Sequence, residues 1–302
     1  MKEVKNCKLF EVGPRDGLQS EDKILSVKEK FELIKLLVAT GVKNIEVASF
    51  VRPDWVPQMA GAAELFKLIK ASRSKAFKSC AFWAFVPNDK GLDRALDAGV
   101  DGAGFFYASS KTFCKKNVNT EKKQLKKNLS QLLEKAREKK LAHRVYLSTS
   151  FHCPYEGETG FADLQADVGF LASQGVKDIV LSDTTGYAHP AMLQKFLKAL
   201  TKKYNSKLFS LHLHDTRGMA LANILQALSF GIQRFDASVA GAGGCPYAPG
   251  ASGNVAMEDL IYMLTQMKKV NKLNLKAYVK AAKFLQKKLA KDFPSHQLNI
   301  LG

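Results

Sequence analysis

The sequence predicts an α/β protein folded as a TIM (β/α)8 barrel with extra C-terminal helices. Strand-like and helix-like segments alternate along the chain, and eight such pairs are present. No Pro-, Gly- or Ser-rich linker separates them, and 302 residues is an ordinary length for one such barrel. We therefore expect a single domain over residues 1–302, with the barrel at about 8–268 and a helical extension at about 269–302.

The eight expected strands are short runs that are either apolar throughout or alternate between apolar and polar residues. They cover residues 8–14, 44–50, 80–86, 102–108, 144–151, 178–183, 208–214 and 234–240. A helical pattern follows each strand. Two of these helices end at a glycine, Gly41 and Gly175, as helices often do. One more helical segment, at about 274–290, follows the eighth pair.

Composition and termini exclude several classes of protein. The five cysteines are scattered and form no C-x-x-C pair, which argues against a disulfide framework and for a reducing compartment. No apolar run approaches the ~20 residues of a membrane span. The first residues contain no signal-peptide core, and no transit peptide precedes the first strand. We expect a cytoplasmic protein with no membrane partner.

The formal net charge of +18 raises the question of a nucleic-acid partner. The cations are mostly lysines on helical faces, mixed with Glu and Gln, and no nucleic-acid-binding motif is present. This pattern favours a solvated lysine surface, so we expect no nucleic acid to bind. A positive field would still help to capture a small anionic substrate.

Two histidines in the seventh expected strand are the strongest functional signal. The segment Phe209-Ser-Leu-His-Leu-His-Asp alternates, so His212 and His214 share one face of a strand. Two imidazoles in this arrangement can bind one divalent metal ion. The alternative is that both are ordinary strand histidines, each satisfied by a neighbour.

Active sites of such barrels are built from the C-terminal ends of several strands, and polar residues occur at three more of these ends. Arg15 and Asp16 follow the first strand, where they could form an anion clamp and a metal ligand or only a surface ion pair. Glu46 lies inside an apolar strand and needs a partner, for which Arg15 is the obvious choice. Asp183 ends a wholly apolar strand, where a carboxylate is typical of a functional site.

A long glycine-rich segment follows the eighth strand, as in mobile active-site loops. Cys245 lies within it and is a candidate reactive thiol. Asn254 ends it, either as the N-cap of the next helix, with Glu258 and Asp259 in the first turn, or as a metal ligand through its side-chain oxygen.

Several of these segments together resemble the 3-hydroxy-3-methylglutaryl-CoA (HMG-CoA) lyases, within a metal-dependent barrel superfamily that also contains Claisen-type condensing enzymes. The resemblance extends from about residue 8 to 290. It is carried by Val12-Gly-Pro-Arg-Asp-Gly-Leu-Gln, Ser49-Phe-Val-Arg-Pro-Asp-Trp-Val-Pro-Gln-Met, His212-Leu-His-Asp-Thr and Ala240-Gly-Ala-Gly-Gly-Cys-Pro-Tyr-Ala-Pro-Gly-Ala-Ser-Gly-Asn.

The resemblance implies a role for each candidate residue. The family's metal ligands fall on Asp16, His212, His214 and Asn254, and its catalytic residues on Arg15, Asp16, Glu46, Asp183 and Cys245. The implied reaction cleaves HMG-CoA into acetoacetate and acetyl-CoA with the help of a divalent metal. Mg²⁺ or Mn²⁺ fits the ligand set, although histidines leave Zn²⁺ and Co²⁺ open. A homodimer is expected.

The implied mechanism has two charged stages, an alkoxide and then a thioester enolate. Asp16, or a group near it, is the candidate base, Arg15 would stabilise the enolate, and Cys245 would protonate it. The phosphate end of CoA needs cations, which the segment after the fourth strand could supply. Its candidate substrate-binding residues, in addition to Arg15 at the first strand, are Ser109, Lys111, Lys115 and Lys116; the three lysines could equally be ordinary solvated surface side chains.

Two other functions and two other proton donors stay open. The chain could be a Claisen-type condensing enzyme acting on a 2-oxo acid, or a catalytically silent basic protein that binds nucleic acid. Cys7 and Cys80 precede or begin strands, so both are expected away from the active-site mouth of the barrel. Cys114 and Cys153 follow strand ends and remain alternatives to Cys245.

Overall fold

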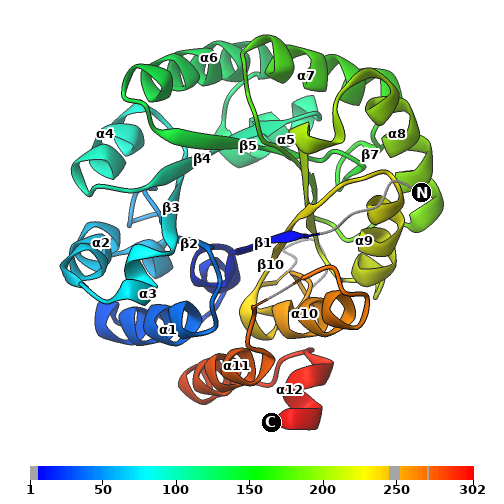
Figure 1. Cartoon of the computed structure of the whole chain (residues 1–302). Coiled ribbons are helices and arrows are strands. Elements are labelled where there is room, and N and C mark those ends of the chain that lie inside the picture. Colours follow the sequence, from blue (N-terminus) through cyan, green and yellow to red (C-terminus); the bar gives the residue numbers. More distant parts are fainter. Residues whose placement is uncertain (1–5, 245–251, 271) are drawn as a thin grey trace.

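The computed structural model describes residues 6–244, 252–270 and 272–302. Eight parallel strands close into a barrel in the order β1-β10-β9-β8-β5-β4-β3-β2, and a ring of helices surrounds it (Figure 1). The predicted TIM barrel is confirmed. A short antiparallel hairpin, β6 (His152–Cys153) with β7 (Gly157–Glu158), is added after the fifth barrel strand.

All eight expected strands are present. Their bounds are β1 Lys8–Glu11, β2 Asn44–Ser49, β3 Ala81–Val86, β4 Gly102–Ala108, β5 Ala142–Ser148, β8 Ile179–Asp183, β9 Phe209–Leu213 and β10 Arg234–Ala237. The first and last strands are shorter than predicted. A π-helical turn, η1 (Gly13–Gly17), takes over after β1, and a 3-10 turn, η4 (Val239–Gly241), follows β10.

The helices begin and end where local chemistry favours it. Ser26 forms a capping box with Glu29 at the start of α1. Gly41 and Gly175, the two predicted helix ends, have φ values of 90° and 75°, which few other residues adopt without strain. The helices are α1 Val27–Ala39, α2 Ala62–Ala71, α3 Lys75–Lys78, α4 Asp89–Asp97, α5 Lys111–Val118, α6 Lys122–Glu138, α7 Phe161–Ser173, α8 Pro190–Lys203, α9 Ala220–Ser229, α10 Met257–Gln266, α11 Leu275–Leu289 and α12 His296–Leu301, with 3-10 turns at η2 Pro57–Met59 and η3 Ser206–Leu208.

The predicted C-terminal extension is helical. Helix α11 packs against α1 and η4, outside the ring of barrel helices, and α12 packs against α10 and α11 (Figure 1). Within the described ranges, none of the helices combines the length and the apolar character needed to span a bilayer.

Charged side chains lie inside the barrel, among its apolar core. Glu46, Arg144, His212 and Asp236 come from four different strands, and each is at most 3% exposed. Buried charges require partners. Asp236 faces both Arg144 and His212, and Glu46 accepts hydrogen bonds from Arg15 and Tyr146. This polar interior positions the site described next.

Candidate active site

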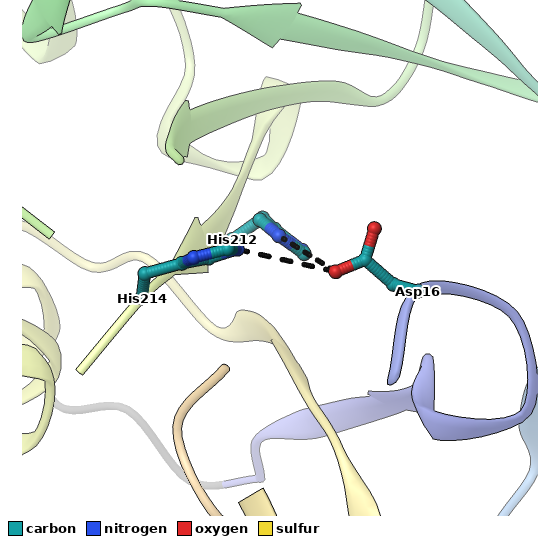
Figure 2. A group of neighbouring side chains, drawn as sticks. All are labelled: Asp16, His212 and His214. Atoms are coloured by element: carbon teal, nitrogen blue, oxygen red, sulfur yellow. Dashed lines mark ion pairs between the residues drawn. The ribbon is translucent and has the colours of Figure 1, made fainter. Parts of the chain in front are cut away.

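Three predicted metal ligands converge at the C-terminal mouth of the barrel. Asp16 lies on η1 after β1, while His212 and His214 lie on β9 and directly after it; Figure 2 shows both imidazoles directed at the Asp16 carboxylate. The Nε2 atoms of His212 and His214 lie 3.8 and 3.9 Å from Asp16 Oδ2. One ligand atom from each residue falls within 4.8 Å of the others, close enough for one ion to contact all three.

The protonation states of this cluster suit a divalent cation. Burial would raise the pKa of Asp16, but the charges of Arg15, His212 and His214 hold it well below its usual range. Burial and the neighbouring His212 lower the pKa of His214 to about 4. At neutral pH, Asp16 is therefore an anion and His214 has a free lone pair. One carboxylate with two imidazoles is a donor set that Mg²⁺, Mn²⁺ or Zn²⁺ accepts.

On the other side of the His212 ring lies a carboxylate that the sequence did not single out. Asp236 Oδ2, on the adjacent strand β10, lies 3.4 Å from His212 Nδ1. Arg144 on β5 faces the same carboxylate, with Nη2 at 2.9 Å from Asp236 Oδ1. A carboxylate behind a ligating histidine fixes the ring orientation and favours the tautomer whose Nε2 faces the metal.

Arg15 is fixed inside the mouth by two carboxylates. Its Nε donates to Glu46 and its Nη1 to Asp16, which confirms the predicted pairing of Arg15 with Glu46. Tyr146 donates its hydroxyl to the other oxygen of Glu46 at 3.1 Å, and the guanidinium carbon lies 4.9 Å from the centre of the Phe85 ring. Burial would lower the pKa of Arg15, but Asp16 and Glu46 raise it, so the guanidinium stays charged.

Asn254 reaches the cluster, but it is not the helix N-cap that was its alternative role. Helix α10 is capped at Ala256, two residues later. Asn254 Nδ2 donates to Asp16 Oδ2 at 2.8 Å and to the Ala242 carbonyl at 3.1 Å. An amide ligates a metal through its oxygen, so ligation by Asn254 requires the amide to turn over. Its role as a fourth ligand stays a prediction.

Asp183 organises the turn after β8. It is buried, and its oxygens accept hydrogen bonds from the backbone of Tyr187 at 3.1 Å and Ala188 at 2.8 Å and from the Thr185 hydroxyl at 3.2 Å. These contacts hold the β8–α8 turn beside the mouth. In this structure Asp183 holds the turn after β8 in place. Its predicted catalytic role stays a prediction.

Two of the cysteines lie away from the active-site mouth, as predicted. Cys7 and Cys80 lie at the opposite, N-terminal end of the barrel, and burial raises their pKa values to about 11 and about 12. Cys114 is fully buried, and burial raises its pKa to about 11. Cys153 is 1% exposed and its Sγ donates to Ser110 Oγ at 3.0 Å. The predicted catalytic thiol, Cys245, lies outside the described residues.

The four candidate CoA-binding residues follow β4. Ser109 precedes α5, and Lys111, Lys115 and Lys116 lie on this helix. Ser109 is buried, and its carbonyl accepts a hydrogen bond from Lys122 at 2.7 Å. Lys115 pairs with Glu121 at 3.4 Å, and Lys116 lies over the Tyr155 ring at 4.2 Å. Lys111 is exposed in the first turn. Their contact with a substrate stays a prediction.

Sequence reasoning missed Tyr146, Arg144 and Asp236. It searched the ends of strands, whereas these residues lie inside them and face the barrel interior. The available signal was the polar alternation of β5, where Arg144 and Tyr146 flank Val145, and a carboxylate between two apolar residues in β10. That signal marks an inward-facing polar residue but does not identify its partner across the barrel.

The fold and the site define a class: an α/β barrel with a carboxylate–histidine–histidine cluster that could hold a metal ion and a buried arginine at its C-terminal mouth. The HMGL-like family model matches residues 6–285, and this chain belongs to the HMGL-like family. A hydroxymethylglutaryl-CoA lyase of Bacillus subtilis is 40% identical over 296 residues, covering 98% of this chain and 97% of that protein.

Two further relatives agree. A Pseudomonas aeruginosa protein named as a 3-hydroxy-3-isohexenylglutaryl-CoA/hydroxymethylglutaryl-CoA lyase is 38% identical, over 98% of this chain and 97% of its own length. The crystal structure of a Bacillus subtilis HMG-CoA lyase superposes with a TM-score of 0.95 at 39% identity, covering 99% of both chains. The family resemblance seen in the sequence motifs is therefore confirmed over nearly the whole chain.

Proposed function

We propose that this protein is an HMG-CoA lyase, which cleaves HMG-CoA into acetoacetate and acetyl-CoA. The observation that carries this function is the convergence of Asp16, His212 and His214 beside the fixed guanidinium of Arg15. The relatives at about 40% identity that cover nearly the whole chain are named as lyases of this substrate. A single domain of this kind is sufficient to hold the site.

Asp16, His212, His214 and, after amide rotation, Asn254 would hold the divalent metal. When bound, Mg²⁺ or Mn²⁺ would act as a Lewis acid and make the substrate's hydroxyl more acidic. The remaining chemistry belongs to the side chains. Asp16, or a group near it, is the candidate acceptor for the hydroxyl proton.

Arg15 provides the positive charge for the second stage. Breaking the carbon–carbon bond leaves its electron pair on the thioester α-carbon, and the resulting enolate oxygen carries negative charge. A guanidinium held by Glu46 and stacked near Phe85 can stabilise that charge without reorganising. The enolate then takes a proton from a nearby donor, for which Cys245 is the candidate, and acetyl-CoA forms.

The lysines of α5 are the candidates for the phosphate end of CoA. Helix α5 follows β4 and therefore lies at the same end of the barrel as Asp16 and Arg15. Lys111, Lys115 and Lys116 add positive charge to this rim.

We also propose that the protein acts as a cytoplasmic homodimer. Mass photometry would check the oligomeric state, and fractionation of the host cells would check the location.

The decisive experiment is an assay of metal-stripped protein with Mg²⁺ or Mn²⁺ added back. HMG-CoA should disappear only after metal addition and give acetoacetate and acetyl-CoA in equal amounts by mass spectrometry. Full turnover after verified chelation would contradict the metal site. Release of free CoA that depends on an added 2-oxo acid would instead identify a condensing enzyme.

A further inference from the structure

A cavity of about 630 Å³ opens at the N-terminal mouth of the barrel, the end opposite the metal site. It is lined by the first residues of several strands, among them Leu9 and Phe10 of β1, Asn44 of β2 and Ala142 of β5. This volume is within the range of small-molecule binding sites. The activity proposed above has its reacting groups at the other end of the strands, and of the residues that line this cavity it involves only Arg144 and Asp236, which lie behind His212.

Positive charge gathers around this cavity. Six cationic side chains from separate segments line it, against two carboxylates, Asp178 and Asp236. The cations are Lys8, Arg137, Lys140, Arg144, Lys177 and Arg234. Three of the eight arginines of the chain are therefore in one cavity, and arginine is the side chain best suited to carboxylate and phosphate groups.

The two carboxylates offset only two of the six cations, Arg144 and Arg234, with which they pair, so four cations remain uncompensated. Asp236 Oδ1 lies 2.9 Å from Arg144 Nη2, and Asp178 Oδ1 lies 3.2 Å from Arg234 Nη2. Among the described residues, Lys8, Lys140 and Lys177 have no carboxylate within ion-pair distance. A ring of unneutralised cations around a concave surface concentrates anions there.

Arg144 is the one buried side chain among these six cations. Arg144 is 1% exposed and lines the cavity, yet its Nη1 has no hydrogen-bond partner within the described part of the chain. The Nη1 atom itself is closed to solvent, so a ligand in the cavity would interact with the charge of Arg144 at a distance rather than through a hydrogen bond. The apolar wall formed by Phe10, Trp83 and Leu141 could cover the carbon skeleton of such a ligand.

We propose that the N-terminal mouth of the barrel is a second binding site, which takes a small organic molecule bearing two or more carboxylate or phosphate groups. The lysine rim and the arginines would share its negative groups, and the apolar wall would cover its body. This site is independent of the lyase activity and would remain if that proposal failed.

The test compares two double variants with the same total change of charge. Lys8→Glu/Lys177→Glu reverses two exposed cations at the cavity, and Lys195→Glu/Lys280→Glu reverses two exposed cations on α8 and α11, which do not line it. Citrate and inorganic pyrophosphate are titrated by calorimetry into metal-free protein at fixed ionic strength, with acetate as the singly charged control. The Lys8→Gln/Lys177→Gln variant removes the two charges without reversing them.

The wild type should bind one equivalent of citrate or pyrophosphate saturably, and acetate much more weakly. Reversal at the cavity should weaken binding by about ten-fold or more, and neutralisation by less, because each close charge contributes directly to the attraction. The α8/α11 double variant should change affinity by less than about two-fold, since salt screens distant charges. Equal weakening in both double variants, or no saturable binding of either polyanion, would overturn the site.

Discussion

Arg15 keeps its charge in a buried position because Glu46 and Asp16 face it from two sides, and the planar guanidinium contacts both at once. A lysine at this position would keep the charge but could not reproduce that fork. The same carboxylates that hold Arg15 also set its direction toward the mouth. Replacing Arg15 by lysine can therefore change the orientation of the positive group while its charge is kept.

Arg15→Lys should lower kcat by about 10²- to 10³-fold while KM changes little, if Arg15 acts on the enolate rather than on the ground state. Steady-state kinetics with HMG-CoA, at saturating metal, gives both constants. The control is Arg52→Lys, an exposed arginine that pairs with Asp54 on the surface. A change confined to KM would mean that Arg15 only anchors the substrate.

Substitutions of His212 and Asp236 should lower the affinity for metal to different degrees. His212→Ala removes a ligand and should abolish tight binding and turnover, as should Asp16→Ala. Asp236→Asn keeps the shape but removes the anion 3.4 Å from His212 Nδ1, which should weaken metal binding by about 10- to 100-fold. Titration of Mn²⁺ followed by electron paramagnetic resonance measures affinity without reference to activity. Wild-type affinity in Asp236→Asn would show that Asp236 serves only the packing of Arg144.

The two candidate thiols can be separated by serine substitution. Cys245→Ser should retain metal binding and lose most turnover, and substrate should shield Cys245 from alkylation. Cys153→Ser should stay active, because that thiol is buried against Ser110. A dead Cys153→Ser beside a fully active Cys245→Ser would reverse the assignment of the proton donor.

Strand β4 shows how one element makes room for the site. Gly104 faces the barrel interior, where an added Cβ would lie 2.7 Å from Tyr146 Cε2 and 2.8 Å from Glu46 Oε1. Both distances are shorter than real carbon contacts allow, so a side chain here would displace the pair that holds Arg15. The glycine is therefore part of the site although it touches no substrate.

Gly104→Ala should lower kcat by about ten-fold or more, because a shift below 1 Å in a positioning group is enough to misplace the reacting atoms. Metal affinity should change far less, since His212 and His214 lie on another strand. The control is Gly175→Ala, at a helix end on the outside of the barrel, where a Cβ meets nothing within 4 Å. It should cost stability through its positive φ but leave kcat unchanged. Normal kcat in Gly104→Ala would show that the Glu46–Tyr146 pair can relax.

The helices and strands could be predicted where the residue pattern that defines them lies within a short stretch of sequence. Alternation placed His212 and His214 on one face, and the rule for parallel barrels brought Asp16 to the same mouth. Asn254 was ambiguous because a polar residue before a helix has the same pattern as a cap and as a ligand. Asp236 could not be predicted, because its partners lie on other strands and depend on the register of the closed barrel.

At the scale of the whole molecule, two buried glutamates tie the barrel to its outer helices. Glu11 on β1 accepts hydrogen bonds from the backbone of Gly13 and Val239, and Glu258 on α10 accepts from Ala240 with both oxygens. Burial raises the pKa of Glu11 to about 7 and that of Glu258 to about 8, against an ordinary value of 4.5. Both carboxyls therefore hold protons in the folded protein at pH values where the unfolded chain has released them.

This difference predicts that stability falls as pH rises. Below pH 4.5 both states are protonated and the contribution is complete; it is lost as pH rises through about 7 and about 8. Each pKa unit corresponds to about 1.4 kcal/mol, so the unfolding free energy should fall by a few kcal/mol between about pH 5.5 and 8.5. Glu11→Gln/Glu258→Gln should remove most of this slope, because an amide does not titrate. The amide oxygens can still accept the backbone hydrogen bonds, so the fold should be retained. Unfolding of the metal-free protein by guanidinium chloride at several pH values measures how the unfolding free energy depends on pH. The control is Glu64→Gln, a substitution of an exposed glutamate. If the double variant keeps the wild-type slope, other groups set the pH dependence of the fold.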